Sequence, residues 1–275
     1  MFGLPTQLSL KILDRTYQQK IEAIRSSAQH QREIDYFLKN ISKVVSVEDL
    51  MEDYRLYSFT MKAFDLEEHI PYRAMMKKIL ESDLEDRSSL ANRLVDSRLK
   101  SYAKEMGFMY EGSTNLNTIS AKWREEMVER YLTVQLETQE GEANPNVEAA
   151  LYFRRKAPEI TNWYQILGDK RLAEVMRKAL MLPDQIAAVD VDRQAELFQQ
   201  KFDIAKFQDP AEVDKLITRY AALADADPAN GFASMGTGAG RALSMLTANA
   251  SMGLTSQIIS IDPVSVQNFG KLIRY

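Results

Sequence analysis

The sequence predicts an all-α fold, in which two pseudo-repeated helical lobes precede a Gly-rich, weakly charged C-terminal tail. Apolar residues recur at three- and four-residue steps along most of the chain. Asp, Ser and Asn stand where these runs begin, and most of the 11 Gly and 8 Pro stand where they end. Residues 50–66 also return as residues 166–182 at a constant offset (169 − 53 = 116). The matching pairs are Asp53/Asp169, Arg55/Arg171, Leu56/Leu172, Lys62/Lys178, Ala63/Ala179 and Leu66/Leu182.

The first two predicted helices cover residues 7–27 and about 31–43. In the first, one face carries Leu10, Leu13, Tyr17, Ile21 and Ile24. This face favours a helix that packs on the core or bridges the lobes, and a partner-binding helix is the alternative. In the second, we expect four inward residues, namely Ile34, Phe37, Leu38 and Ile41.

Cap residues place the remaining helices of the first lobe, which spans about 31–108. Ser46 and Asp49 have the spacing of a capping box, and Asp53 follows as the cap of the next helix. That helix should bury Leu56, Phe59, Thr60, Ala63 and Phe64. Pro71 suits a first helical turn, and Ser88 suits the cap of a later helix that breaks near Asp96.

A bridging helix over about 119–138 should join the lobes, with Trp123, Met127, Tyr131 and Val134 in line. Residues 140–146 read as a loop, after which Asn146 can cap the first helix of the second lobe, about 146–225. Further helix starts are predicted at Asp169, at Asp190 or Asp192, and at Asp209-Pro210.

The last fifty residues differ from the rest of the chain, so we divide it into a domain over 1–225 and a tail over 226–275. The tail has five charged residues, Asp227, Arg241, Asp262, Lys271 and Arg274, where the chain-wide 27% predicts about thirteen. It should either cover the lobes or bind a partner. The candidate partner-binding residues are Met245, Leu246, Met252, Leu254, Ile258, Ile259 and Phe269.

No motif in the sequence indicates catalysis, and we predict no catalytic, cofactor-binding or metal-binding residues. The absence of cysteine excludes disulfides, thiolate nucleophiles and Cys-based zinc sites. The two histidines, His30 and His69, lack metal-ligand spacing. The Gly-rich piece 231–241 lacks the Lys-Ser/Thr of a phosphate-binding loop. Two carboxylates that converge only in space would leave room for an unrecognised hydrolase.

The charge pattern and hydropathy limit the partners. The net charge is −4 and basic residues alternate with acidic ones, so we expect no nucleic-acid binding. No run approaches the roughly 20 apolar residues of a membrane span. The start, MFGLPTQLSLKILDRTY, has no uninterrupted apolar core, so it is not a cleaved signal peptide.

Three segments carry a family resemblance: LMEDYRLYSFTMKAFDLEE, KKILESDLEDRSSLANRLVDSRLKSYAKEMGF and ALYFRRKAPEITNWYQILGDKRLAEVMRKAL. They resemble the bacterial domain-of-unknown-function family 1217. The resemblance implies an all-helical fold and no established activity. It also implies a flagellar connection, since members occur mainly in alphaproteobacteria and often lie beside flagellar genes.

Together these observations predict a non-enzymatic structural or interaction protein of flagellar assembly or motility, with a protein partner. It would be cytoplasmic, or exported to the flagellum without a cleaved signal peptide. A cytoplasmic binding module or export chaperone for a helical partner is the alternative. The sequence leaves the partner and the oligomeric state open.

Overall fold

The computed structural model describes residues 4–109 and 111–227. Contacts between Cα atoms divide the chain into a compact unit over 1–225 and a second over 226–275. The description below concerns the first unit. The all-α prediction is confirmed, because the β pairing found across the described ranges is one isolated bridge between Met109 and Thr114.

Thirteen α-helices and five short 3-10 helices make up the described chain. The α-helices are α1 (Thr6–Ser26), α2 (Ala28–Asn40), α3 (Val47–Glu52), α4 (Tyr54–Ala63), α5 (Arg73–Leu80), α6 (Leu90–Arg93), α7 (Ser97–Met106), α8 (Ala121–Ala143), α9 (Pro145–Lys156), α10 (Trp163–Leu167), α11 (Lys170–Ala179), α12 (Val191–Lys201) and α13 (Pro210–Ala226). The 3-10 helices are η1 (Ile41–Lys43), η2 (Glu67–His69), η3 (Ala157–Glu159), η4 (Asp184–Ala188) and η5 (Ile204–Gln208).

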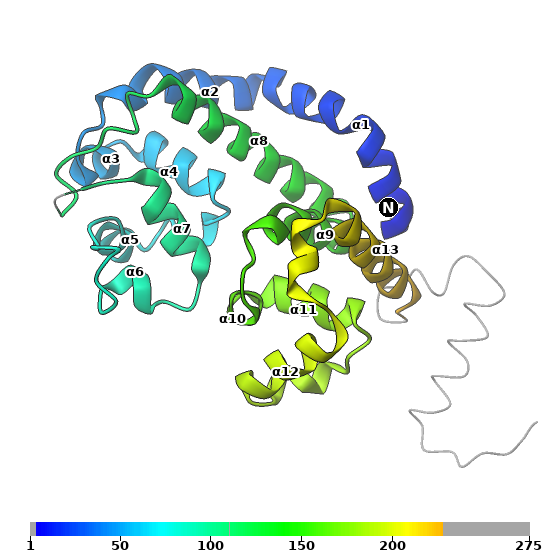
Figure 1. Cartoon of the computed structure of the whole chain (residues 1–275). Helices are drawn as coiled ribbons and strands as arrows, with labels where there is room; N and C mark the ends of the chain where they lie inside the picture. Colours follow the sequence, from blue (N-terminus) through cyan, green and yellow to red (C-terminus); the bar gives the residue numbers. More distant parts are fainter. Residues whose placement is uncertain (1–3, 110, 228–275) are drawn as a thin grey trace, which may run out of the picture. The chain divides into compact units, whose positions relative to one another are not determined.

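Helix α8 is the centre of the unit. It runs between the group α3–α7 and the group α9–α13, with α1 and α2 alongside (Figure 1). It packs against α4, α9 and α1. Apart from an exposed face with Lys122, Glu125, Glu126 and Glu129, most sides of the helix carry buried residues. The buried residues are Trp123, Met127, Val128, Tyr131, Leu132, Val134, Leu136, Glu137 and Gly141.

An aromatic stack joins α8 to the group α3–α7. The ring of Tyr131 stacks on Phe59 with 4.3 Å between centroids, and Phe59 stacks on Phe37 at the same distance. The Tyr131 hydroxyl also lies 2.8 Å from Nδ1 of His30. Trp123 lies at the Phe37 end of the stack and donates its Nε1–H to the Glu105 carbonyl at 3.0 Å, so it is a packing residue.

The N-terminus of α4 has a compact arrangement of cap, tyrosine and arginine. The Asp53 carboxylate accepts the backbone N–H groups of Arg55 and Leu56, as predicted for a cap. The Tyr36 hydroxyl donates to the same carboxylate at 2.7 Å. The Arg55 guanidinium lies 3.8 Å from the centroid of the Tyr36 ring. The Asp53 carboxylate thereby fixes the Tyr36 hydroxyl, and the Tyr36 ring in turn fixes the Arg55 guanidinium.

The same arrangement of cap, tyrosine and arginine recurs at the start of α11. Asp169 accepts the N–H groups of Arg171 and Leu172 and the hydroxyl hydrogen of Tyr152. The Arg171 guanidinium lies 3.7 Å from the Tyr152 ring centroid. Both ends of α11 differ from those of α4 by the same offset (170 − 54 = 116 and 179 − 63 = 116). The two segments therefore share local structure as well as sequence.

Two further local features follow the 116-residue offset. Ser46 before α3 and Asn162 before α10 each form a capping box with the residue three positions on. Asp65 and Met181, which follow α4 and α11, both have positive φ, at 58° and 54°. A left-handed residue is costly outside glycine, so its presence at both positions marks a shared helix ending.

The predicted end of the bridging helix is wrong. Residues 140–143 do not form a loop, because α8 continues to Ala143 and one residue, Asn144, separates it from α9. Asn144 rather than Asn146 is the cap, and Pro145 takes the first helical position. Gly141 lies inside the helix, where the lack of a side chain leaves room for Glu148. A Cβ at this position would lie 2.1 Å from Glu148 Oε2.

Three smaller predictions of the first lobe are also wrong. Leu38 is 41% exposed, because Ile34, Phe37 and Ile41 already fill the inward face. Pro71 lies outside the first turn of α5, because Tyr72 is the cap and the helix begins at Arg73. The Ser88 hydroxyl donates to the Asp86 carboxylate instead of capping a helix, and α6 starts after Ser89. Local side-chain bonds of this kind compete with capping.

The caps give the first testable prediction. Replacing Asp53 or Asp169 by Ala removes the acceptor for two backbone N–H groups and a tyrosine hydroxyl. Each change should lower the free energy of unfolding by about 1–2 kcal/mol. Urea denaturation measures this. Asp35→Ala, at an exposed position in the interior of α2, is the matched control and should change stability by less than about 0.5 kcal/mol. Equal stabilities for all three variants would contradict the capping roles.

Candidate functional site

A groove of about 760 Å³ lies between α1, α8 and α9. This volume is within the usual range for ligand-sized sites. Its lining mixes apolar and charged side chains from all three helices. The main lining residues are Tyr17, Leu136 and Leu151 together with Asp14, Arg15, Glu137, Arg154 and Arg155. The groove can therefore hold an amphipathic group better than a purely apolar one.

A buried ion pair lies in the lining of the groove. Arg155 donates from Nε and Nη2 to the two carboxylate oxygens of Glu137, each at 2.7 Å. The side chains are 17% and 6% exposed. Burial alone would lower the pKa of Arg155, but the hydrogen bonds and charge of Glu137 raise it above its ordinary value. Arg155 therefore stays charged, and the two hydrogen-bonded side chains form part of the groove lining.

Further polar contacts tie the walls of the groove together. Arg154 contacts Asp14 on α1 through Nη1 at 2.7 Å and Asp214 on α13 through Nε at 3.1 Å. The hydroxyls of Tyr17 and Thr133 lie 3.4 Å apart. Because α1, α9 and α13 are linked in this way, we expect the groove to keep its width.

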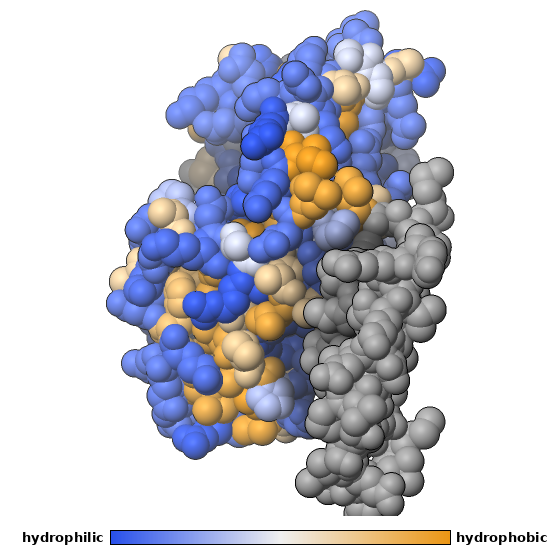
Figure 2. All heavy atoms as spheres, turned by 90° about the vertical axis from the view of Figure 1, so that its right-hand side faces the viewer, coloured by the Kyte–Doolittle hydropathy of each residue, from blue (hydrophilic) through white to orange (hydrophobic). Residues whose placement is uncertain are grey.

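Helix α1 carries the exposed apolar residues Leu8 and Ile12, and the exposed Leu4 lies just before the helix; these three residues are called the apolar stripe. The side chains of Leu4, Leu8 and Ile12 are 52%, 45% and 40% exposed. The four-residue spacing of Leu8 and Ile12 places these two on the side of α1 away from the buried Leu10 and Leu13. Figure 2 faces the side of the unit where the N-terminal part of α1 lies, and it shows apolar patches between hydrophilic areas. Grouped exposed apolar residues often mark contact surfaces.

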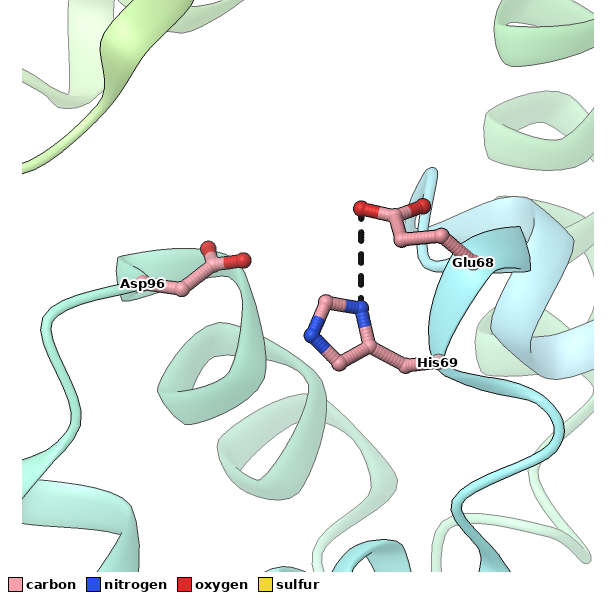
Figure 3. Close-up of side chains that lie close together, drawn as sticks. All are labelled: Glu68, His69 and Asp96. Carbon is pink, nitrogen blue, oxygen red and sulfur yellow. Dashed lines mark ion pairs between the residues drawn. The ribbon is translucent and has the colours of Figure 1, made fainter.

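The structure brings together one cluster that the sequence did not predict. Glu68 and His69 from η2 and Asp96 from the start of α7 each place a potential ligand atom within 4.8 Å of the others (Figure 3). Arg98 already binds both carboxylates, with Nη2 at 2.7 Å from Glu68 and 2.8 Å from Asp96. A cation would have to compete with this guanidinium, so we interpret the cluster as an ion-pair site.

Two carboxylates also converge away from the groove. The Arg171 guanidinium binds Asp65, and its Nη1 lies 3.6 Å from Glu148. Burial raises the pKa of Glu148, and the charge of Arg171 opposes that shift. A raised carboxyl pKa suits a general acid. However, neither carboxylate lines the groove, so the arrangement lacks an adjoining substrate site there.

The sequence profile described as "Protein of unknown function (DUF1217)" matches residues 63–213, more than half of the chain. The chain belongs to the DUF1217 family. It is also similar to the crystal structure of protein AGR_C_984 from Agrobacterium tumefaciens, with 30% identity and a TM-score of 0.72. The match covers 81% of this chain and 95% of that one. No curated protein gives a significant match.

The family match covers only part of the groove. The DUF1217 profile covers α8 and α9, whereas α1 and its apolar stripe lie outside the matched range. The predicted partner-binding residues, Met245 to Phe269, lie outside the described residues, so that prediction stays open. The groove was missed in the sequence because its lining residues come from segments over a hundred positions apart.

The buried pair in the groove lining yields a second testable prediction. Glu137→Gln leaves Arg155 buried without a counter-charge, which should cost about 3–5 kcal/mol of unfolding free energy. The double variant Glu137→Met/Arg155→Met removes both charges and should be clearly more stable than the single one. Chemical denaturation of the three proteins gives the comparison. A single variant that loses under about 1 kcal/mol would show that the pair is not buried in this way.

The Arg98 cluster predicts a loss of stability in acid. Burial opposes ionisation of Asp96 and Glu68, but hydrogen bonds to Arg98 (for Glu68, also its own backbone N–H) lower the pKa of both below the ordinary values of about 3.9 and 4.3. The folded state therefore binds these protons less tightly than the unfolded chain. The stabilisation is present above about pH 4 and is lost as the pH falls through the lower, folded pKa values.

Thermal unfolding between pH 7 and pH 2.5 measures this loss. Arg98→Gln should lower the melting temperature at pH 7 and reduce its fall below pH 4. If the wild-type and variant curves stay parallel through the acid range, Arg98 does not hold these carboxylates ionised.

Proposed function

We propose that this DUF1217 protein is a non-enzymatic interaction protein of flagellar assembly or motility, and that α1 binds a helical segment of a protein partner. The observation that carries the proposal is the two-sided character of α1. One side of the helix is buried against the unit, while the other presents Leu8 and Ile12, with Leu4 of the apolar stripe just before the helix.

The stripe has the spacing that helix-to-helix recognition uses. Partner helices bind through apolar anchors spaced along one helix face, and Leu8 and Ile12 supply such anchors at i and i+4, with Leu4 just before the helix. The groove adds charged side chains, and its most buried charges are already paired with each other, as Glu137 is with Arg155. A surface that is apolar in one part and charge-balanced beside it favours protein contact over acid–base chemistry.

The flagellar setting is supported by the family resemblance alone, through the flagellar genes that often lie beside those of family members. None of the described helices has the length and apolarity needed to cross a bilayer. A cytoplasmic export chaperone for a helical partner is the alternative. Cell fractionation separates the two, because a chaperone stays in the cytoplasm while an axial component appears in purified filaments or basal bodies.

The proposal predicts that charge on the stripe blocks both binding and motility. Leu8→Glu/Ile12→Glu should leave the fold intact, because both positions are exposed, and should lose the partner in a pull-down from the native bacterium. In a strain lacking the gene, this variant should not restore swimming or filament number. Val95→Glu, at a 78% exposed apolar position remote in sequence, is the matched control and should restore both.

Normal swimming of the deletion strain would refute the flagellar role. Full partner recovery by the Leu8→Glu/Ile12→Glu variant would refute the binding surface on α1. The tail, residues 226–275, would then be the candidate binding segment.

A further inference from the structure

A second cavity lies on the other flank of α8, between α7, α9 and the α10–α11 segment. Its volume is about 460 Å³. Four basic side chains line it, namely Lys100 and Lys104 from α7, Arg130 from α8 and Lys156 from α9. We call it the basic cleft. The groove at α1 shares none of these residues, so the two sites are independent.

The positive charge of the basic cleft is only partly neutralised. Three carboxylates line it, those of Glu105, Glu159 and Asp169. Asp169 accepts two backbone N–H groups and the Tyr152 hydroxyl, so its charge is already engaged. Glu159 lies 2.9 Å from the Lys156 ammonium.

The other three cations are free of ion pairs within the described chain. Among residues 4–109 and 111–227, no carboxylate lies within 4.0 Å of Lys100, Lys104 or Arg130. Ordinary surface cations are solvated, but these three converge on one concave site. Low-dielectric walls around such a site strengthen the attraction for an anion.

The basic cleft also positions its arginine. The Arg130 guanidinium lies 4.5 Å from the centroid of the Phe64 ring, and Phe64 in turn packs edge-on against Tyr102 at 5.2 Å. A guanidinium that lies over a ring can still donate its N–H groups to an anion. Arg130 is half-buried, so little conformational freedom remains to be lost when a ligand binds.

An apolar wall completes the basic cleft. Phe64, Ile160 and Leu172 are each at most 5% exposed and belong to its lining. Lys156 is only 9% exposed, which places a cation deep beside this wall. A ligand that fits must combine negative charge with an apolar body.

We propose that the basic cleft binds a small organic polyanion, in which phosphate or clustered carboxylate groups contact Arg130, Lys100 and Lys104 and the carbon body packs on Ile160 and Leu172. The volume suits a compact metabolite-sized molecule, since ligand pockets commonly span about 300–1,000 Å³. Bidentate contact with Arg130 would give such an anion its orientation.

Calorimetric titration of the full chain tests the proposal, with phenyl phosphate and citrate as probes for the two anion types. One of the two should bind with one-to-one stoichiometry, and the affinity should fall as ionic strength rises. Arg130→Gln should weaken that binding at least tenfold. Arg87→Gln, at an exposed position outside the cleft, is the matched control and should leave it unchanged.

A second variant keeps the test decisive if Arg130→Gln perturbs folding. Lys100→Gln/Lys104→Gln changes two exposed side chains and should also weaken binding at least tenfold. Absence of binding for both probes, or equal weakening by Arg87→Gln, would overturn the proposal. The function proposed for α1 would be unaffected, because these variants leave Leu8 and Ile12 unchanged.

Discussion

The burial of α8 against helices on several sides is the constraint on which the rest of the unit depends. Helix α8, with 23 residues, buries Trp123, Met127 and Tyr131 on one side and Leu132 and Leu136 on another. A helix with so much apolar surface is not stable alone in water. Its neighbours α1, α4 and α9 must cover it. Hydrophobic burial of about 25 cal/mol per Å² supplies the driving force, and the helices on either side become one folding unit.

Both cavities follow from this central position. On one flank, α8 contributes Leu136 and Glu137 to the groove beside α1 and α9. On the other, it contributes Arg130 to the basic cleft beside α7 and α9. Polar residues on a buried helix are costly unless they are paired or face a cavity. Glu137 is paired with Arg155, and Arg130 faces the basic cleft beside the Phe64 ring.

Local features of the fold could be predicted from the sequence because they depend on neighbours a few positions apart. The caps at Ser46, Asp53 and Asp169 are confirmed for this reason. The end of α8 was predicted wrongly because Gly141 and the following polar residues resemble a loop. The contact that requires glycine there comes from Glu148, which only the folded chain brings close.

The candidate sites were harder to predict than the helices. Periodicity correctly predicted that the face of α1 with Leu10, Leu13, Ile21 and Ile24 is buried, but it did not single out Leu4, Leu8 and Ile12 as an exposed apolar stripe. The basic cleft joins residues from α7, α8 and α9. Its cations looked ordinary in the sequence, because Lys100, Lys104, Arg130 and Lys156 are brought to one cavity only when the chain folds.

Native-state hydrogen exchange followed by mass spectrometry tests the central position of α8 most directly. If α8 holds the unit together, its backbone amides from Met127 to Leu136 should exchange only through global unfolding, as slowly as any in residues 4–227. The amides of α4 and α11 should not open independently of one another. Exchange of α8 that is faster than that of α4 or α11, or separate opening of the helices on its two sides, would contradict the account.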